Sequence, residues 1–71
     1  MKKIELETGG TVWKILTKPG DLVEEGDILF ILEVMKMEVP YEAPISGKVI
    51  AVHIAEGDFV EEEQLALEIA D

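Results

Sequence analysis

An internal repeat constrains the fold of this chain more than any other feature. Residues 10–33, GTVWKILTKPGDLVEEGDILFILE, align without gaps with residues 47–70, GKVIAVHIAEGDFVEEEQLALEIA, at a shift of 37 residues. Seven aligned pairs are identical, and several others exchange one apolar residue for another. Solenoids built from units of this size need three or more copies. Two copies in 71 residues therefore indicate a quasi-two-fold structure whose halves share one core.

Each copy has the pattern strand, turn, short strand, turn, strand. The stretches TVWKILT (11–17) and KVIAVHI (48–54) are rich in β-branched and aromatic residues, which favour strands. In the glycine turn that follows the first stretch, Pro19 presets φ at one central position and Gly20 accepts a positive φ at the next. The sequence thus predicts an all-β fold, a flattened β-barrel or sandwich of two small antiparallel sheets with quasi-two-fold symmetry.

The two copies are joined by residues 34–46, VMKMEVPYEAPIS. Pro40 and Pro44 cannot donate ladder hydrogen bonds, so the returning strand is expected at a sheet edge or as an irregular segment. A domain of this size buries only about 60% of its unfolded surface and leaves little room for an enclosed cleft. We therefore expect residues 1–71 to form a single, monomeric domain.

The two-fold pattern also predicts a hairpin between the copies, on the side opposite the two termini. Glu33–Val34 at the end of the first copy is expected to pair with Met37–Glu38 at the start of the return. Met35 and Lys36 are then the two central residues of the turn, and the lysine is held out into solvent.

Charge excludes several classes of partner. The chain has 16 acidic residues, six lysines and no arginine, for a formal net charge of −10. Such a surface repels nucleic acid and anionic membranes, and it lacks the guanidinium fork that binds phosphate bidentately. The absence of cysteine excludes thiol catalysis and thiolate metal sites. The N-terminal residues 1–10 lack the apolar stretch of a signal peptide, so we expect a cytoplasmic protein.

Three short motifs give the chain a resemblance to a known family. EVMKM (33–37) is followed by Ala-Pro (43–44) and then by Ser-Gly (46–47). With the flanking half-repeats, this pattern resembles the biotinyl/lipoyl attachment domains, and among them the biotin carboxyl carrier proteins. The resemblance spans Gly10 to about Ile69. The short KPGD turn (18–21) leaves no room for the protruding thumb loop of some bacterial carriers, so the chain is most similar to the thumbless ones.

The resemblance implies a function. Lys36 would bear covalent biotin, attached by a biotin protein ligase through biotinyl-adenylate. The domain would carry carboxylate from a biotin carboxylase to a carboxyltransferase, in a biotin-dependent carboxylase of the acyl-CoA type, without catalysing either step. The same resemblance assigns ligase recognition and turn formation to five flanking residues: Glu33, Val34, Met35, Met37 and Glu38.

The roles of the two methionines and of Val34 can also be argued from their side chains and positions. Methionine fills core space well, but Met35 and Met37 are placed symmetrically about a turn, which favours a role as adaptable apolar contacts for a ligase. Val34 stands where the family usually has alanine, and we expect its added bulk to affect the ligase encounter.

Three alternatives follow from the same residues. Lipoyl domains share the fold but usually place Asp before the lysine and a small residue after it, so the methionines favour biotin over lipoate. An unmodified interaction module would not need the lysine motif. Ser46, His53 and Asp58 are residue types of a hydrolytic triad, but no glycine-rich elbow or oxyanion device accompanies them. His53 reads as an ordinary strand residue and a lone ligand, so neither a catalytic residue nor a metal site is predicted.

Overall fold

The computed structural model describes residues 1–71 as eight strands in two four-stranded antiparallel sheets. The strands are β1 (Lys2–Glu5), β2 (Gly10–Ile15), β3 (Leu22–Val23), β4 (Ile28–Val34), β5 (Met37–Glu42), β6 (Gly47–Val52), β7 (Phe59–Val60) and β8 (Leu65–Ala70). Sheet A has the order β1-β8-β6-β3 and sheet B the order β5-β4-β2-β7. The predicted all-β class is confirmed. No helix of the structure is long and apolar enough to span a bilayer.

The quasi-two-fold symmetry extends to the register of the ladders. Val12 of β2 pairs with Leu32 of β4, and Val49 of β6 pairs with Ile69 of β8, each partner displaced by the repeat length. Both ladders then shift register at equivalent points, after Val12 and after Val49. A bulge retained in both copies indicates that the two halves adopt the same backbone and not merely a similar strand order.

The repeat observed in the structure begins earlier than residue 10. β1 pairs with β8 as β5 pairs with β4, so that Ile4 lies opposite Leu67 where Tyr41 lies opposite Phe30. The N-terminal strand is therefore the two-fold counterpart of the strand that returns from the hairpin.

Residues of both halves meet in one core between the sheets. Phe30, Leu32, Leu67 and Ile69 are fully buried at the centre, and the Phe30 ring stacks on Tyr41 with 4.7 Å between ring centroids. Burying side chains of this size contributes about 1.5–3 kcal/mol each. Thirteen buried residues form the core cluster: Ile4, Leu6, Val12, Leu29, Phe30, Leu32, Ala43, Val49, Ile54, Val60, Ala66, Leu67 and Ile69.

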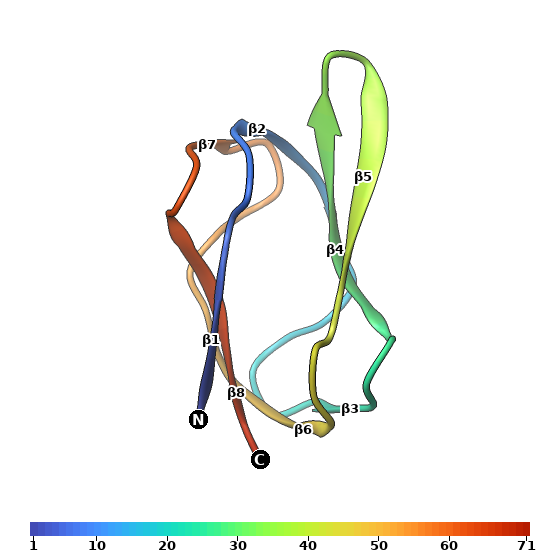
Figure 1. Ribbon diagram of the computed structural model, residues 1–71, viewed down its shortest axis with the longest axis vertical. Coiled ribbons are helices and arrows are strands. Elements are labelled where there is room, and N and C mark those ends of the chain that lie inside the picture. Colours follow the sequence, from blue (N-terminus) through green and yellow to red (C-terminus); the bar gives the residue numbers. More distant parts are fainter.

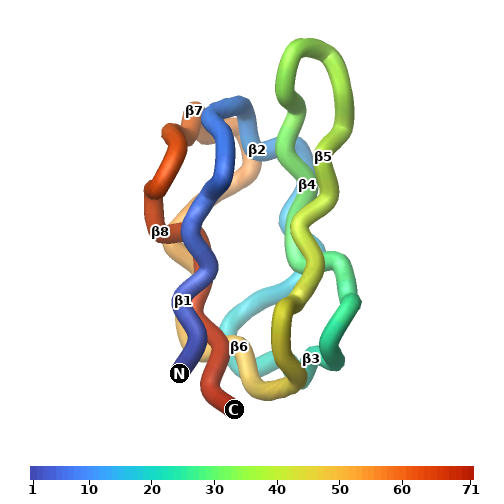
Figure 2. The backbone as a smooth tube through the Cα atoms, in the orientation of Figure 1, coloured from blue at the N-terminus to red at the C-terminus, as the bar shows by residue number.

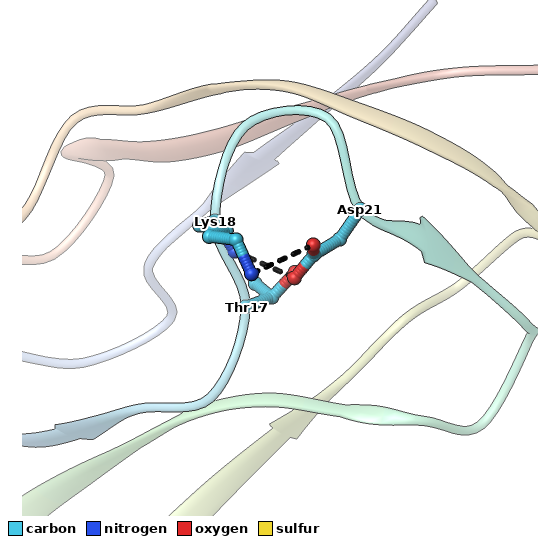
Figure 3. A network of polar contacts seen from close by, with 3 residues as sticks. All are labelled: Thr17, Lys18 and Asp21. Atoms are coloured by element: carbon cyan, nitrogen blue, oxygen red, sulfur yellow. Dashed lines mark hydrogen bonds and ion pairs between the residues drawn. The ribbon is translucent and has the colours of Figure 1, made fainter.

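Turns with the same hydrogen-bond pattern flank the short strands β3 and β7 on both sides. The Asp21 carboxylate accepts a hydrogen bond from the Lys18 backbone N–H at 3.0 Å and one from the Thr17 hydroxyl at 3.2 Å (Figure 3). The Lys18 N–H is the main reason that the pKa of Asp21 is lowered from 3.8. Gly20 adopts φ of 97°, as the sequence predicts. Three further turns bond in the same way through the side chains of Asp27, Asp58 and Gln64.

The molecule is elongated, with extents of 32 × 18 × 17 Å. The β4–β5 hairpin projects from one end and both termini lie at the other, as the sequence predicts (Figures 1 and 2). β7 lies at the hairpin end of the body, and β3 lies at the end with the termini. The strand β5, which contains Pro40, is an edge strand of sheet B, also as predicted.

Candidate functional site

The tip of the β4–β5 hairpin is a two-residue turn with an unusual backbone. β4 ends at Val34 and β5 begins at Met37, so Met35 and Lys36 are the two central residues, as the sequence predicts. Their φ angles are 51° and 65°. Positive φ at both central residues marks a type I′ turn, which matches the twist of the strands but is normally built from Asn and Gly. Left-handed φ costs a residue with a Cβ about 1–2 kcal/mol.

The last two residues of β4, directly before the turn, are anchored to β2 by a close backbone approach. A Cβ placed on Gly10 would lie 2.7 Å from the Glu33 carbonyl oxygen and 2.9 Å from Val34 Cγ2, so only glycine fits there. Val34 is half-buried and packs against the core. Because Val34 directly precedes the turn, its packing against the core holds the strained turn in place.

Lys36 is exposed and has no partner within the domain. None of the observed ion pairs or hydrogen bonds involves its ammonium group, whereas the ammonium of Lys18 pairs with Asp21 at 3.4 Å. Lys14 lies 5.9 Å from the centroid of the Trp13 ring. An amine without competing contacts is available to an enzyme that approaches from solvent, and this is the chemistry that a covalent attachment site requires.

The methionines beside Lys36 do not fill the core. Met35 is 90% exposed and Met37 is 66% exposed. Flexible, polarisable side chains in such positions offer adaptable apolar contact to a partner. Their exposure excludes the space-filling alternative considered from the sequence and leaves the contact role as the prediction.

Glu33 and Glu38 lie directly opposite each other across the hairpin, on its outer face. Like charges in opposed positions destabilise a sheet by about 0.2–1 kcal/mol. The pair adds no stability to the free domain, and a cation from outside would relieve the repulsion.

The other residue types with catalytic potential are not assembled. The Ser46 hydroxyl accepts a hydrogen bond from the Glu25 N–H at 3.0 Å, and His53 Nε2 lies 2.7 Å from a carboxylate oxygen of Glu68. Asp58 bonds within its own turn. Contrary to the sequence expectation, His53 is not a strand residue, because β6 ends one residue earlier. The contacts of these side chains form no triad.

The surface has no enclosed pocket at the hairpin tip. Its largest hollow, about 510 Å³, is an open groove beside Glu7, Val39 and Tyr41, along the edge strand β5. The Tyr41 hydroxyl accepts a hydrogen bond from the Glu7 N–H there, at 3.0 Å. A group attached to Lys36 would therefore start in solvent and not in a cavity of this domain.

Comparisons with known proteins agree with this geometry. A family model for biotin and lipoyl domains, described as "Biotin-requiring enzyme", matches residues 3–69. The Biotin/lipoyl attachment protein of Bacillus subtilis is 43% identical over 68 residues, which cover 96% of this chain and 93% of that protein.

Two further matches come from much larger proteins. The dihydrolipoyllysine-residue acetyltransferase component of the Mycoplasma capricolum pyruvate dehydrogenase complex is 36% identical over 64 residues, 90% of this chain and 15% of that protein. The crystal structure of Kluyveromyces lactis urea carboxylase superposes with a TM-score of 0.90 at 38% identity, covering 97% of this chain and 6% of that one.

Proposed function

The chain belongs to the biotin/lipoyl attachment family, and from this premise we propose that it is a biotin carboxyl carrier domain with Lys36 as its attachment residue. Domains of this family are carriers and not catalysts. The observation that supports the site most strongly is the backbone at the tip. A strained two-residue turn holds one unpartnered lysine at the far end of the molecule from both termini.

Attachment requires a lysine for chemical reasons. The neutral ε-amine of Lys36 attacks the acyl carbon of biotinyl-adenylate; a C–N bond forms, the acyl–phosphate C–O bond breaks, AMP leaves and the nitrogen releases a proton. The product is an amide, which resists hydrolysis. The exposed side chain fits this reaction, because no contact within the domain has to be broken before a ligase reaches the amine.

Once attached, biotin supplies a ring that accepts carboxylate and gives it up again. The lysine and valeryl carbons separate the ring from the backbone by about ten single bonds, a reach on the order of 12 Å. The Gly10 contact and the Val34 packing fix the other end of this arm. A fixed anchor with a flexible arm raises the local concentration of the ring at each active site that the domain visits.

The residues that flank Lys36 favour biotin. Met35 and Met37 present thioether side chains on both sides of the amine, the pattern of biotin carriers, whereas lipoyl domains usually place Asp and a small residue there. Lipoate is the second candidate, since the matched relatives include the Mycoplasma capricolum acetyltransferase.

The partners follow from the proposed chemistry. A biotin protein ligase attaches the group, a biotin carboxylase loads it from bicarbonate with ATP, and a carboxyltransferase passes the carboxylate to an acceptor, which we take to be an acyl-CoA. The match to urea carboxylase supports a place in a biotin-dependent carboxylase.

Two measurements test the proposal. The domain is co-expressed with a biotin protein ligase or with a lipoate ligase, and the intact mass is recorded in each case. We expect the biotin increment; a lipoyl increment alone would establish the second candidate. The biotinylated domain is then incubated with a biotin carboxylase, ATP and labelled bicarbonate. Label in the protein supports carboxylate carriage, and its absence beside a labelled reference carrier would refute it.

A further inference from the structure

Phe59 is a large apolar side chain that the core does not use. It is 88% exposed, while its neighbour Val60 is 4% exposed and faces the core. β7 pairs with β2 so that Phe59 lies opposite Thr11, on the outer face of sheet B. Contact with solvent over nearly the whole of a phenylalanine is unfavourable unless a partner covers it.

The ladders of sheet B place Phe59 in one row with the hairpin acids. Phe59 is opposite Thr11, Thr11 is opposite Glu33, and Glu33 is opposite Glu38. At the usual spacing between strands, the backbone of Phe59 lies about 10 Å from the backbone of Glu33 and about 14 Å from that of Glu38. Lys36 is only three residues further along the hairpin than Glu33. A standard interface of about 800 Å² per partner covers Phe59 and Lys36 together.

The two-fold-related row in the other half of the molecule has different residues, so the fold itself does not require the residues of the hairpin row. The equivalent row at the other end of the molecule begins at Leu22, continues with Lys48 and then Ala70. Leu22 is 82% exposed, so the backbone leaves this position open in both halves. The rows differ in charge, since the hairpin row has two carboxylates where the other has one ammonium group.

The charge of the hairpin row indicates what binds to it. Glu33 and Glu38 repel each other in the free domain, and a lysine or arginine placed between them turns the repulsion into attraction. β7 lies at the hairpin end of the body (Figure 1), and the two residues that directly follow it, Glu61 and Glu62, are both exposed. A partner that complements this surface therefore has an apolar pocket for Phe59, surrounded by basic side chains that face the carboxylates.

We propose that the outer face of sheet B at the hairpin end is the docking surface for the ligase that modifies Lys36, and that Phe59 is its apolar anchor. This inference rests on the proposed function, because it requires an enzyme that reaches Lys36. Phe59 acts as a positioning residue: it binds the enzyme and does not touch the reacting atoms.

The two-fold counterpart of Phe59 provides a matched control. Steady-state modification by biotin protein ligase, with biotin and MgATP, is measured for the wild type, Phe59→Ala and Leu22→Ala. Loss of an interface anchor is expected to lower kcat/KM about tenfold or more, mainly through KM. Leu22→Ala should stay within about twofold of the wild type, because an exposed residue remote from the contact is energetically neutral. Thermal melts confirm that both variants are folded.

A second pair of variants tests the charge of the partner. Glu61→Lys/Glu62→Lys and Glu24→Lys/Glu25→Lys carry the same net charge. The substituted pairs directly follow β7 and β3, which are two-fold-related strands at opposite ends of the molecule. We expect the first variant alone to lower kcat/KM and to reduce its dependence on salt, since the altered charges lie beside the ligase.

The outcomes separate this inference from the proposed function. Equal effects of Phe59→Ala and Leu22→Ala, or of the two charge variants, would overturn the docking surface while leaving Lys36 as the attachment residue. Failure of biotin protein ligase to modify the wild type would refute the proposed function and this inference with it.

Discussion

Because Lys36 lies in a strained turn, we predict that this residue, which attachment requires, makes the domain less stable. Lys36 has φ of 65°, which costs a residue with a Cβ about 1–2 kcal/mol. Glycine removes that cost but gains freedom in the unfolded chain, worth about 0.4–1 kcal/mol in the opposite direction. Lys36→Gly should therefore stabilise the domain by about 0.5–1 kcal/mol. With an unfolding entropy of about 2.1 cal/mol/K per residue, this gain raises Tm by about 3–7 °C.

Circular dichroism melts of unmodified wild type, Lys36→Gly and Lys36→Ala measure this effect. Alanine removes the same amine and keeps the strained φ, so its Tm should lie within about 2 °C of the wild type. A higher Tm for the glycine variant alone assigns the gain to the backbone. Equal melts for the two variants, or a lower Tm for Lys36→Gly, would refute the strain assigned to the tip.

Three further changes have defined expectations. Gly10→Ala forces a Cβ against the Glu33 carbonyl and should destabilise the domain by about 1–3 kcal/mol in urea unfolding; an unchanged midpoint would contradict the close approach. Glu63 has φ of 69° where the two-fold counterpart is Gly26, so Glu63→Gly should raise Tm by several degrees, as for the hairpin tip. The lowered pKa of Asp21 stabilises the folded state above the unfolded pKa, near 3.8, and this contribution is lost as pH falls through the lower folded value. Asp21→Asn should therefore be less stable than the wild type at pH 7 and approach it below about pH 4, whereas a constant difference across the pH range would argue against the Asp21 contacts.

Much of the architecture follows from the sequence because the repeat is read directly from it. The shared glycine turns place the short strands, and the two prolines place the returning segment at an edge, where β5 lies. The position of Met35 and Lys36 at the tip follows from the same symmetry, because a two-residue connection is what remains when the flanking residues pair.

Other features depend on contacts that a single sequence does not display. β1 has four residues and little identity with β5, so its place in the repeat becomes visible only through its pairing with β8. The row from Phe59 to Glu38 joins the β4–β5 hairpin to β2 and β7, two strands that are distant from it and from each other in the sequence. His53 follows the alternation of β6 and its backbone N–H still donates to the Ala66 carbonyl of β8 at 2.8 Å, but it lies one residue beyond the end of the strand.

Peptide mapping by mass spectrometry, after complete modification by biotin protein ligase, tests the central assignment most directly. The chain offers six lysines, and we expect the biotin increment on the peptide that contains Lys36 and on no other. The increment should be absent from Lys36→Arg, which retains the wild-type fold. Biotin on a different lysine, or on the Lys36→Arg protein, would contradict the account.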